Sequence, residues 1–143
     1  MISIHDFTGR VIHGNNATVM QSMPDESVDL VVTSPPYDDL RSYGGAEWNF
    51  PLVAESLERI VKIGGVVVWI VGDKTVKGSE TGSSFRQAIH FLDDTQFLLH
   101  DTMIYQKHGM PTDPRLRYYQ RFEFMFVLSK ATRPKTFNPI AGV

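Results

Sequence analysis

Two short apolar runs, each ended abruptly by turn-forming residues, constrain the fold of this chain more than any other feature. The first run covers residues 27–33 and stops at Pro35-Pro36, and the second covers residues 66–71 and stops at Gly72-Asp73. Proline ends a strand because it has no backbone N–H to donate to a ladder. Between the runs, residues 49–62 carry apolar side chains at helical spacing. Strand, helix and strand in this order predict an α/β fold with a largely parallel sheet.

The rest of the chain adds shorter elements to this unit. We expect a first strand over residues 11–13 and a helix over 17–23, and we expect Gly64-Gly65 to cap the helix over 49–62. A Gly/Ser-rich stretch, 78–84, precedes a predicted helix over 85–92. Residues 97–107 and 122–130 are typical of two long strands, which form a C-terminal antiparallel pair. The predicted division is one domain over 1–131 and an irregular tail over 132–143.

Composition excludes several classes of protein. The chain has 143 residues, a net charge of -2 and no cysteine, so disulfides and thiol chemistry are excluded. The longest apolar run has six residues, whereas a membrane-spanning helix needs roughly 18 to 20. No basic and apolar leader begins the chain, which predicts a cytoplasmic protein. The five histidines lack close metal-binding spacings, so we expect no metal site.

The carboxyl ends of the two buried strands are the predicted ligand site, because open α/β sheets bind ligands there. Ser34-Pro35-Pro36-Tyr37 follows the first strand and combines a hydroxyl, rigid carbonyl acceptors and an aromatic face. Such a group suits a planar ligand that carries an amino group. The alternative is an inert proline turn with Tyr37 in the core.

The stretch from Asp25 to Tyr37 closely resembles the catalytic strand and loop of amino-group DNA methyltransferases, in the permuted arrangement called the beta class. Further segments resemble this family in the expected order, and together they cover essentially the whole chain but only about the first half of a typical member. These segments are Gly14-Asn15, 64–66, 71–73, 100–105, 119–130 and 134–140. The resemblance implies an incomplete S-adenosylmethionine-dependent methyltransferase-like (Rossmann-like) sheet.

The resemblance also implies a site-specific DNA methyltransferase of the restriction-modification type, with catalytic residues Ser34, Pro35, Pro36 and Tyr37. Ser34 and the Pro35 carbonyl would accept the hydrogens of an exocyclic amino group, and Tyr37 would stack on a flipped base. Methylation at carbon 5 of cytosine is excluded, because that reaction requires a thiolate. Serine at the first motif position favours cytosine N4 over adenine N6, although the motif residue predicts the base only loosely.

The donor half of the family's fold has no counterpart in the sequence. In the beta class, a glycine-rich loop that holds S-adenosylmethionine lies downstream of the target-recognition region, and none of the 11 glycines here forms a Gly-x-Gly pair. Candidate donor contacts are Asn15, Thr33 and Asp73, although Asn15 also suits a turn and Asp73 also suits a strand end. We expect a fragment, split subunit or degenerate gene product that pairs with another chain or with itself to cover an exposed apolar sheet edge.

A basic and aromatic loop joins the last two predicted strands and suits contact with DNA phosphates and bases. Its candidate residues are Lys107, Arg115, Arg117, Tyr118, Tyr119 and Arg121. The alternative is a solvated connection between two strands. For the whole chain, the alternatives to an enzyme acting on DNA are a non-catalytic DNA-binding remnant and a methyltransferase for RNA or small molecules.

Overall fold

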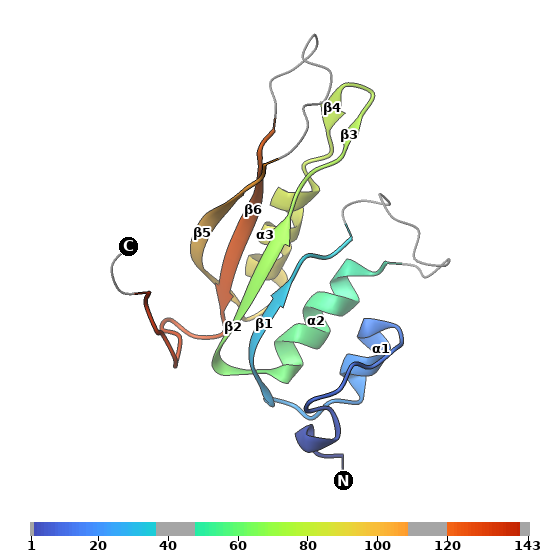
Figure 1. Ribbon diagram of the computed structural model, residues 1–143, viewed down its shortest axis with the longest axis vertical. Helices are drawn as coiled ribbons and strands as arrows, with labels where there is room; N and C mark the ends of the chain where they lie inside the picture. Colours follow the sequence, from blue (N-terminus) through green and yellow to red (C-terminus); the bar gives the residue numbers. More distant parts are fainter. Residues whose placement is uncertain (1, 37–47, 109–119, 141–143) are drawn as a thin grey trace.

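A computed structural model describes residues 2–36, 48–108 and 120–140. Its main feature is a mixed four-stranded sheet with the order β1-β2-β6-β5 (Figure 1). The elements are η1 (Ile4–Asp6), α1 (Asn16–Gln21), β1 (Val28–Thr33), α2 (Phe50–Ile60), β2 (Val61–Val71), β3 (Thr75–Val76), β4 (Ser79–Glu80), α3 (Ser83–Asp94), β5 (Leu98–Gln106) and β6 (Phe122–Ser129). In this part of the chain, no helix is long and apolar enough to cross a membrane.

The predicted parallel β-α-β unit is confirmed by β1, α2 and β2. The two strands pair in parallel, with Val31 opposite Val67 and Thr33 opposite Trp69. α2 is preceded by its N-cap residue Asn49, whose side chain accepts a hydrogen bond from the Leu52 amide at 3.1 Å. This cap satisfies one of the amides that the first helical turn leaves without a helical partner.

The predicted C-terminal antiparallel pair is also confirmed. β6 lies between β2 and β5 and is antiparallel to both, with Val71 opposite Phe124 and Gln106 opposite Phe122. The amino end of β6 and the carboxyl end of β5 therefore meet at the same end of the sheet as the carboxyl ends of β1 and β2. This arrangement follows from the order of the strands, which is visible in Figure 1.

The core lies between α2, α3 and one face of the sheet. Trp69 on β2 is 1% exposed and contacts Phe50 of α2 and Phe91 of α3, with ring centroids 5.8 and 5.1 Å apart. Both helices therefore cover the same face. The Trp69 indole N–H donates to the Gln87 side chain at 2.9 Å, so its polar group is satisfied inside the core.

The structure corrects one expectation about a pair of glycines and one about a strand. Gly64 and Gly65 lie inside β2, at a β-bulge opposite β1, and do not cap α2. Gly64 has φ +80°, and a Cβ on Gly65 would lie 2.7 Å from the Val61 side chain, so both positions need glycine. Residues 11–13 form no strand, and Val11 is fully exposed, because no described strand lies beside it to complete a ladder.

A small antiparallel hairpin, β3-β4, overlaps the Gly/Ser-rich stretch 78–84, where the sequence predicted no strand. Lys77 and Gly78 connect its strands with φ values of 49° and 83°. Positive φ at both central residues defines the tight turn whose twist matches that of paired strands. The Lys-Gly pair was the available sequence signal, although it is weaker than the common Asn-Gly or Asp-Gly pair.

Candidate functional site

Both predicted carboxyl-end corners lie side by side at one end of the sheet. Thr33, the last residue of β1, is opposite Trp69, so Ser34 and Pro35 leave β1 beside the last residues of β2. Gly72 and Asp73 leave β2 at the same end. The two corners are therefore neighbours in the fold, as the sequence predicted.

Three of the four predicted catalytic residues lie in the described part of the chain. Ser34 is exposed, Pro35 is buried and Pro36 is half-buried. A buried proline next to an exposed serine fixes the backbone and leaves the serine on the surface, where a ligand can reach its side chain. Thr33 is half-buried at the end of β1. Tyr37 lies outside the described residues.

Asp73 caps the start of α3. Its carboxylate accepts hydrogen bonds from the Ser84 amide at 3.0 Å and from the hydroxyls of Ser84, Ser83 and Thr81. Burial of the carboxyl raises the pKa of Asp73, but these hydrogen bonds, led by that of the Ser84 side chain, lower it more, so the pKa lies below its ordinary value. These contacts favour a structural role for Asp73, and its contact with a methyl donor stays a prediction.

Replacing Asp73 with alanine should destabilise the fold by about 0.5–2 kcal/mol at pH 7, as losing a helix cap does. The folded-state pKa lies below the ordinary value of 3.8, so this stabilisation is present above that pH and disappears as the pH falls through the folded-state pKa. Urea unfolding at pH 7 and at pH 3 measures both effects. The control Asp93→Ala, at the exposed other end of α3, should change stability by less than about 0.5 kcal/mol. An unchanged gap between wild type and Asp73→Ala at the two pH values would contradict this explanation.

Asn15, another predicted donor contact, is the N-cap of α1. Its side-chain oxygen accepts from the amides of Ala17 and Thr18 at 3.0 and 3.3 Å. Asn15 is thus a helix cap, where the alternative interpretation expected a turn residue, and its contact with the donor stays a prediction.

Two of the six candidate DNA contacts, Lys107 and Arg121, lie in the part of the chain that the structure describes. The Lys107 amide donates to the Arg121 carbonyl at 2.8 Å, and the Lys107 ammonium forms an ion pair with Glu123, which is 7% exposed. The Lys107 charge is therefore largely balanced by Glu123. Arg121 is exposed. The remaining candidates, Arg115, Arg117, Tyr118 and Tyr119, lie outside the described residues.

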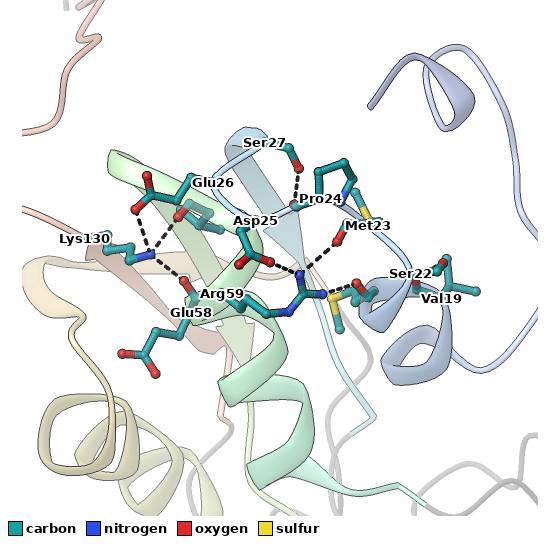
Figure 2. Close-up of polar contacts among 12 residues, drawn as sticks. Val19, Ser22, Met23, Pro24, Asp25, Glu26, Ser27, Glu58, Arg59 and Lys130 are labelled. Carbon is teal, nitrogen blue, oxygen red and sulfur yellow. Dashed lines mark hydrogen bonds and ion pairs between the residues drawn. The ribbon is translucent and has the colours of Figure 1, made fainter. Parts of the chain in front are cut away.

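Two cationic side chains, Arg59 and Lys130, bind backbone carbonyls near the amino end of β1, opposite the candidate site (Figure 2). Arg59 donates to the carbonyls of Met20 and Met23, at the end of α1, and pairs with Asp25. Lys130 donates to the Glu58 carbonyl at 2.7 Å and to the Val61 carbonyl at 3.0 Å, where α2 ends. These bonds hold the segment that leads into β1. The sequence analysis selected neither residue. The available signal was Arg59, a basic residue in the last turn of the helix predicted over residues 49–62.

Replacing Lys130 with methionine should cost about 1–3 kcal/mol, because two carbonyls at the end of α2 lose their donor. Lys130 is 8% exposed, so water cannot readily take its place. Lys62→Met is the matched control, since its ion pair with Asp29 is exposed and should contribute at most about 1 kcal/mol. Denaturant unfolding of both variants decides the comparison, and equal losses would contradict a special role for Lys130.

Comparison with known proteins identifies the family to which this arrangement belongs. Residues 28–141, which include the strand β1 and the Ser-Pro-Pro-Tyr motif, match the N6/N4 methyltransferase model described as DNA methylase. The chain belongs to the N6/N4 DNA methylase family. It is 57% identical over 121 residues to the orphan methyltransferase M.BamHII of Bacillus amyloliquefaciens, which covers 85% of this chain.

Solved structures of methyltransferases share the fold. PvuII DNA methyltransferase, described as cytosine-N4-specific, superimposes with a TM-score of 0.72 over 85% of this chain at 25% identity. M1.HpyAVI, solved as its complex with SAM, superimposes with a TM-score of 0.66 over 94% of this chain at 18% identity. The methyltransferase-like fold expected from the sequence is thereby confirmed.

This chain spans only about half of the proteins it matches. The matched region covers 45% of M.BamHII and 49% of the PvuII methyltransferase chain. Those relatives therefore contain about as much polypeptide again outside the matched region.

Proposed function

We propose that this chain supplies the catalytic side of a DNA methyltransferase that moves a methyl group from S-adenosylmethionine to an exocyclic amino group of a base. The observation that carries the proposal is the position of Ser34 and Pro35, immediately after β1 and beside the carboxyl end of β2. Ligands of open α/β sheets bind at this kind of edge. The family match supports the same reaction class.

The proposed chemistry begins with an amino nitrogen that is a weak nucleophile, because its lone pair is shared with the aromatic ring. The Ser34 hydroxyl and the Pro35 carbonyl accept its two hydrogens and favour a pyramidal nitrogen with a directed lone pair. The base is flipped out of the duplex, since its amino group cannot otherwise be reached, and Tyr37 stacks on it. Fixed acceptors on a proline-restrained backbone lower the cost of orienting the base.

The described residues alone do not form a convincing donor site. Asn15 and Asp73 are engaged in helix caps, and the chain has no Gly-x-Gly pair with which to hold the methionine part of the donor. M1.HpyAVI, whose structure contains SAM, extends well beyond the region it shares with this chain, which covers 59% of it. We therefore assign donor binding mainly to polypeptide outside the matched region.

Cytosine N4 is the proposed target atom, with adenine N6 as the alternative. Support comes from Ser34 at the first motif position and from the likeness to a methyltransferase described as cytosine-N4-specific. A non-catalytic DNA-binding remnant or split subunit is the second candidate function, because the catalytic corner is present while the donor contacts are incomplete.

The test is a chimera in which this chain replaces the matching part of M.BamHII. The chimera and the chain alone are incubated with methyl-labelled S-adenosylmethionine and with DNA, RNA or free nucleosides. The proposal expects label only in DNA and only with the chimera, as N4-methylcytosine on nucleoside mass spectrometry. Binding of DNA by a folded chimera without transfer would favour the remnant, and transfer to RNA or nucleosides would overturn DNA as the substrate.

A further inference from the structure

The β3-β4 hairpin extends beyond the sheet at the end where the candidate site lies. It follows β2 directly after Gly72 and Asp73, and Figure 1 shows it reaching past the carboxyl end of β2. All residues from 75 to 80 are exposed. We call residues 74–81 the projecting hairpin. Its position places it next to any large ligand that reaches Ser34.

Hydrogen bonds at its base hold the projecting hairpin in place. The Thr81 amide donates to the Lys74 carbonyl at 2.9 Å, below the two strand pairs of β3 and β4. The Asp73 carboxylate accepts from the Thr81 hydroxyl at 3.3 Å and from the Ser84 amide at 3.0 Å, which ties the hairpin to the start of α3. A two-stranded hairpin is marginally stable alone, so these bonds give its tip a defined position.

Lys77, at the tip, has a backbone conformation that lysine rarely adopts. Its φ is 49°, in the left-handed region, and Gly78 follows. A residue with a Cβ loses backbone energy there, so such turns ordinarily have Asn, Asp or Gly at this position. The Lys77 side chain is exposed and stabilises no core. Backbone strain at an exposed residue favours a function for its side chain over a structural role.

Positive charge exceeds negative charge in this part of the chain, although the whole chain has a net charge of -2. Lys74 and Lys77 lie in the projecting hairpin and Arg86 in the first turn of α3, whereas Glu80 is the carboxylate of the hairpin. No ion pair among the described residues includes Lys77 or Arg86. Arg86 donates to the uncharged Thr81 carbonyl, so its charge stays unbalanced.

We propose that the projecting hairpin binds the DNA backbone beside the target base, with Lys77 as its main phosphate contact and Arg86 as a second one. This inference rests on the proposed function. Lys77 follows Trp69, the residue opposite Thr33, by eight residues, which span at most about 28 Å. At 3.4 Å per base pair, the contacted phosphates lie within about eight base pairs of the target base.

The first experiment tests whether binding and stability change in opposite directions. Lys77→Asn creates the favoured Asn-Gly turn, so it should raise the melting temperature of the isolated chain by roughly 1 to 4 °C. The same variant should weaken binding to a 30-base-pair duplex of arbitrary sequence roughly 3- to 10-fold at 0.1 M salt. Lys77→Arg keeps the charge and should bind within about twofold of wild type. A lower melting temperature together with weaker binding would assign Lys77 a structural role and overturn the proposal.

Salt dependence shows whether the lost contact is one with a phosphate. Loss of one phosphate contact should reduce the slope of log Kd against log salt by about 0.9. Lys62→Gln is the matched control, because it also removes one positive charge but lies at the other end of β2. It should bind within about twofold of wild type. Equal effects of Lys62→Gln and Lys77→Asn would show that only net charge matters and would overturn the proposal.

Crosslinking locates the contact on the duplex. The chain has no cysteine, so Lys77→Cys provides a single thiol for a photoreactive group. The duplex contains one mismatched cytosine, which is flipped out more easily than a paired base. Crosslinks from Lys77→Cys should fall within about eight base pairs of that cytosine, and those from Ser34→Cys should fall at it. Evenly scattered crosslinks from Lys77→Cys, with Ser34→Cys still at the cytosine, would overturn the proposal.

The outcomes for the hairpin and for the proposed activity are separable. An M.BamHII chimera whose DNA affinity depends on Lys77 but that transfers no methyl group would support the phosphate contact and contradict the activity. A chimera in which Lys77→Asn changes neither DNA affinity nor its salt dependence, while methyl transfer continues, would overturn the hairpin's role and leave the activity in place.

Discussion

Replacing Ser34 with alanine is expected to lower methyl transfer by the M.BamHII chimera roughly 10²–10³-fold, the usual effect of removing one directed hydrogen-bond group from a reacting centre. Ser34 is exposed at the end of β1 and outside the core, so the variant should still fold. The loss should lie in the turnover rate and not in DNA affinity, because the serine acts on the amino group as it becomes nucleophilic. Single-turnover label transfer and DNA binding, measured on the same preparation, separate the two quantities.

Ser3→Ala is the control for this substitution. Ser3 lies near Pro24 and Lys62, toward the other end of β1, and caps the short helix η1. It should retain wild-type transfer. Wild-type turnover in Ser34→Ala would contradict the assigned role of the serine, and weakened DNA binding without a change in turnover would indicate a binding contact instead.

Replacing Trp69 with alanine is expected to reduce the free energy of unfolding by about 3–5 kcal/mol, a large part of the roughly 5–15 kcal/mol that holds a domain together. Trp69 is buried at the junction of β2, α2 and α3, and its removal leaves a cavity beside Phe50 and Phe91. It also removes the hydrogen bond to Gln87, whose amide is 7% exposed.

Denaturant unfolding of the isolated chain measures this loss. Ile70→Val is the control, because Ile70 is the next residue of β2, is half-buried on the face of the sheet opposite α2 and α3, and loses only one methylene. It should cost at most about 1.5 kcal/mol. A loss below 1 kcal/mol for Trp69→Ala would mean that the aromatic cluster is not the centre of the core.

The elements that sequence analysis predicted are those whose pattern is local. The apolar run of β1, the helical spacing of α2 and the alternation of β6 each follow from which face a residue presents, so periodicity is sufficient. Gly64 and Gly65 were assigned wrongly because a helix cap and a β-bulge both need glycine. The choice between them depends on how β1 pairs with β2, which no local pattern contains.

In the candidate site too, the residues that belong to a local motif could be predicted, and those that depend on distant contacts could not. Ser34 and Pro35 could be predicted because the motif is continuous and ends a recognisable strand. The Asp73 cap could not, since it joins the end of β2 to a helix that starts ten residues later, with a hairpin between them. The contact of Lys130 with the end of α2 joins the last strand to an early helix, and such pairings appear only when the tertiary fold is known.

The strand order has a consequence for how the chain folds. β2 is one of the two inner strands of the sheet, and its neighbour β6 comes later in the sequence than every other described strand. Until β6 has left the ribosome, the apolar strand β2 has a partner on one side only, and β5, which pairs with β6, cannot join the sheet. Contacts between residues so distant in sequence slow folding and prolong the lifetime of exposed strand edges. A nascent chain that stops before β6 should therefore depend on chaperones or aggregate.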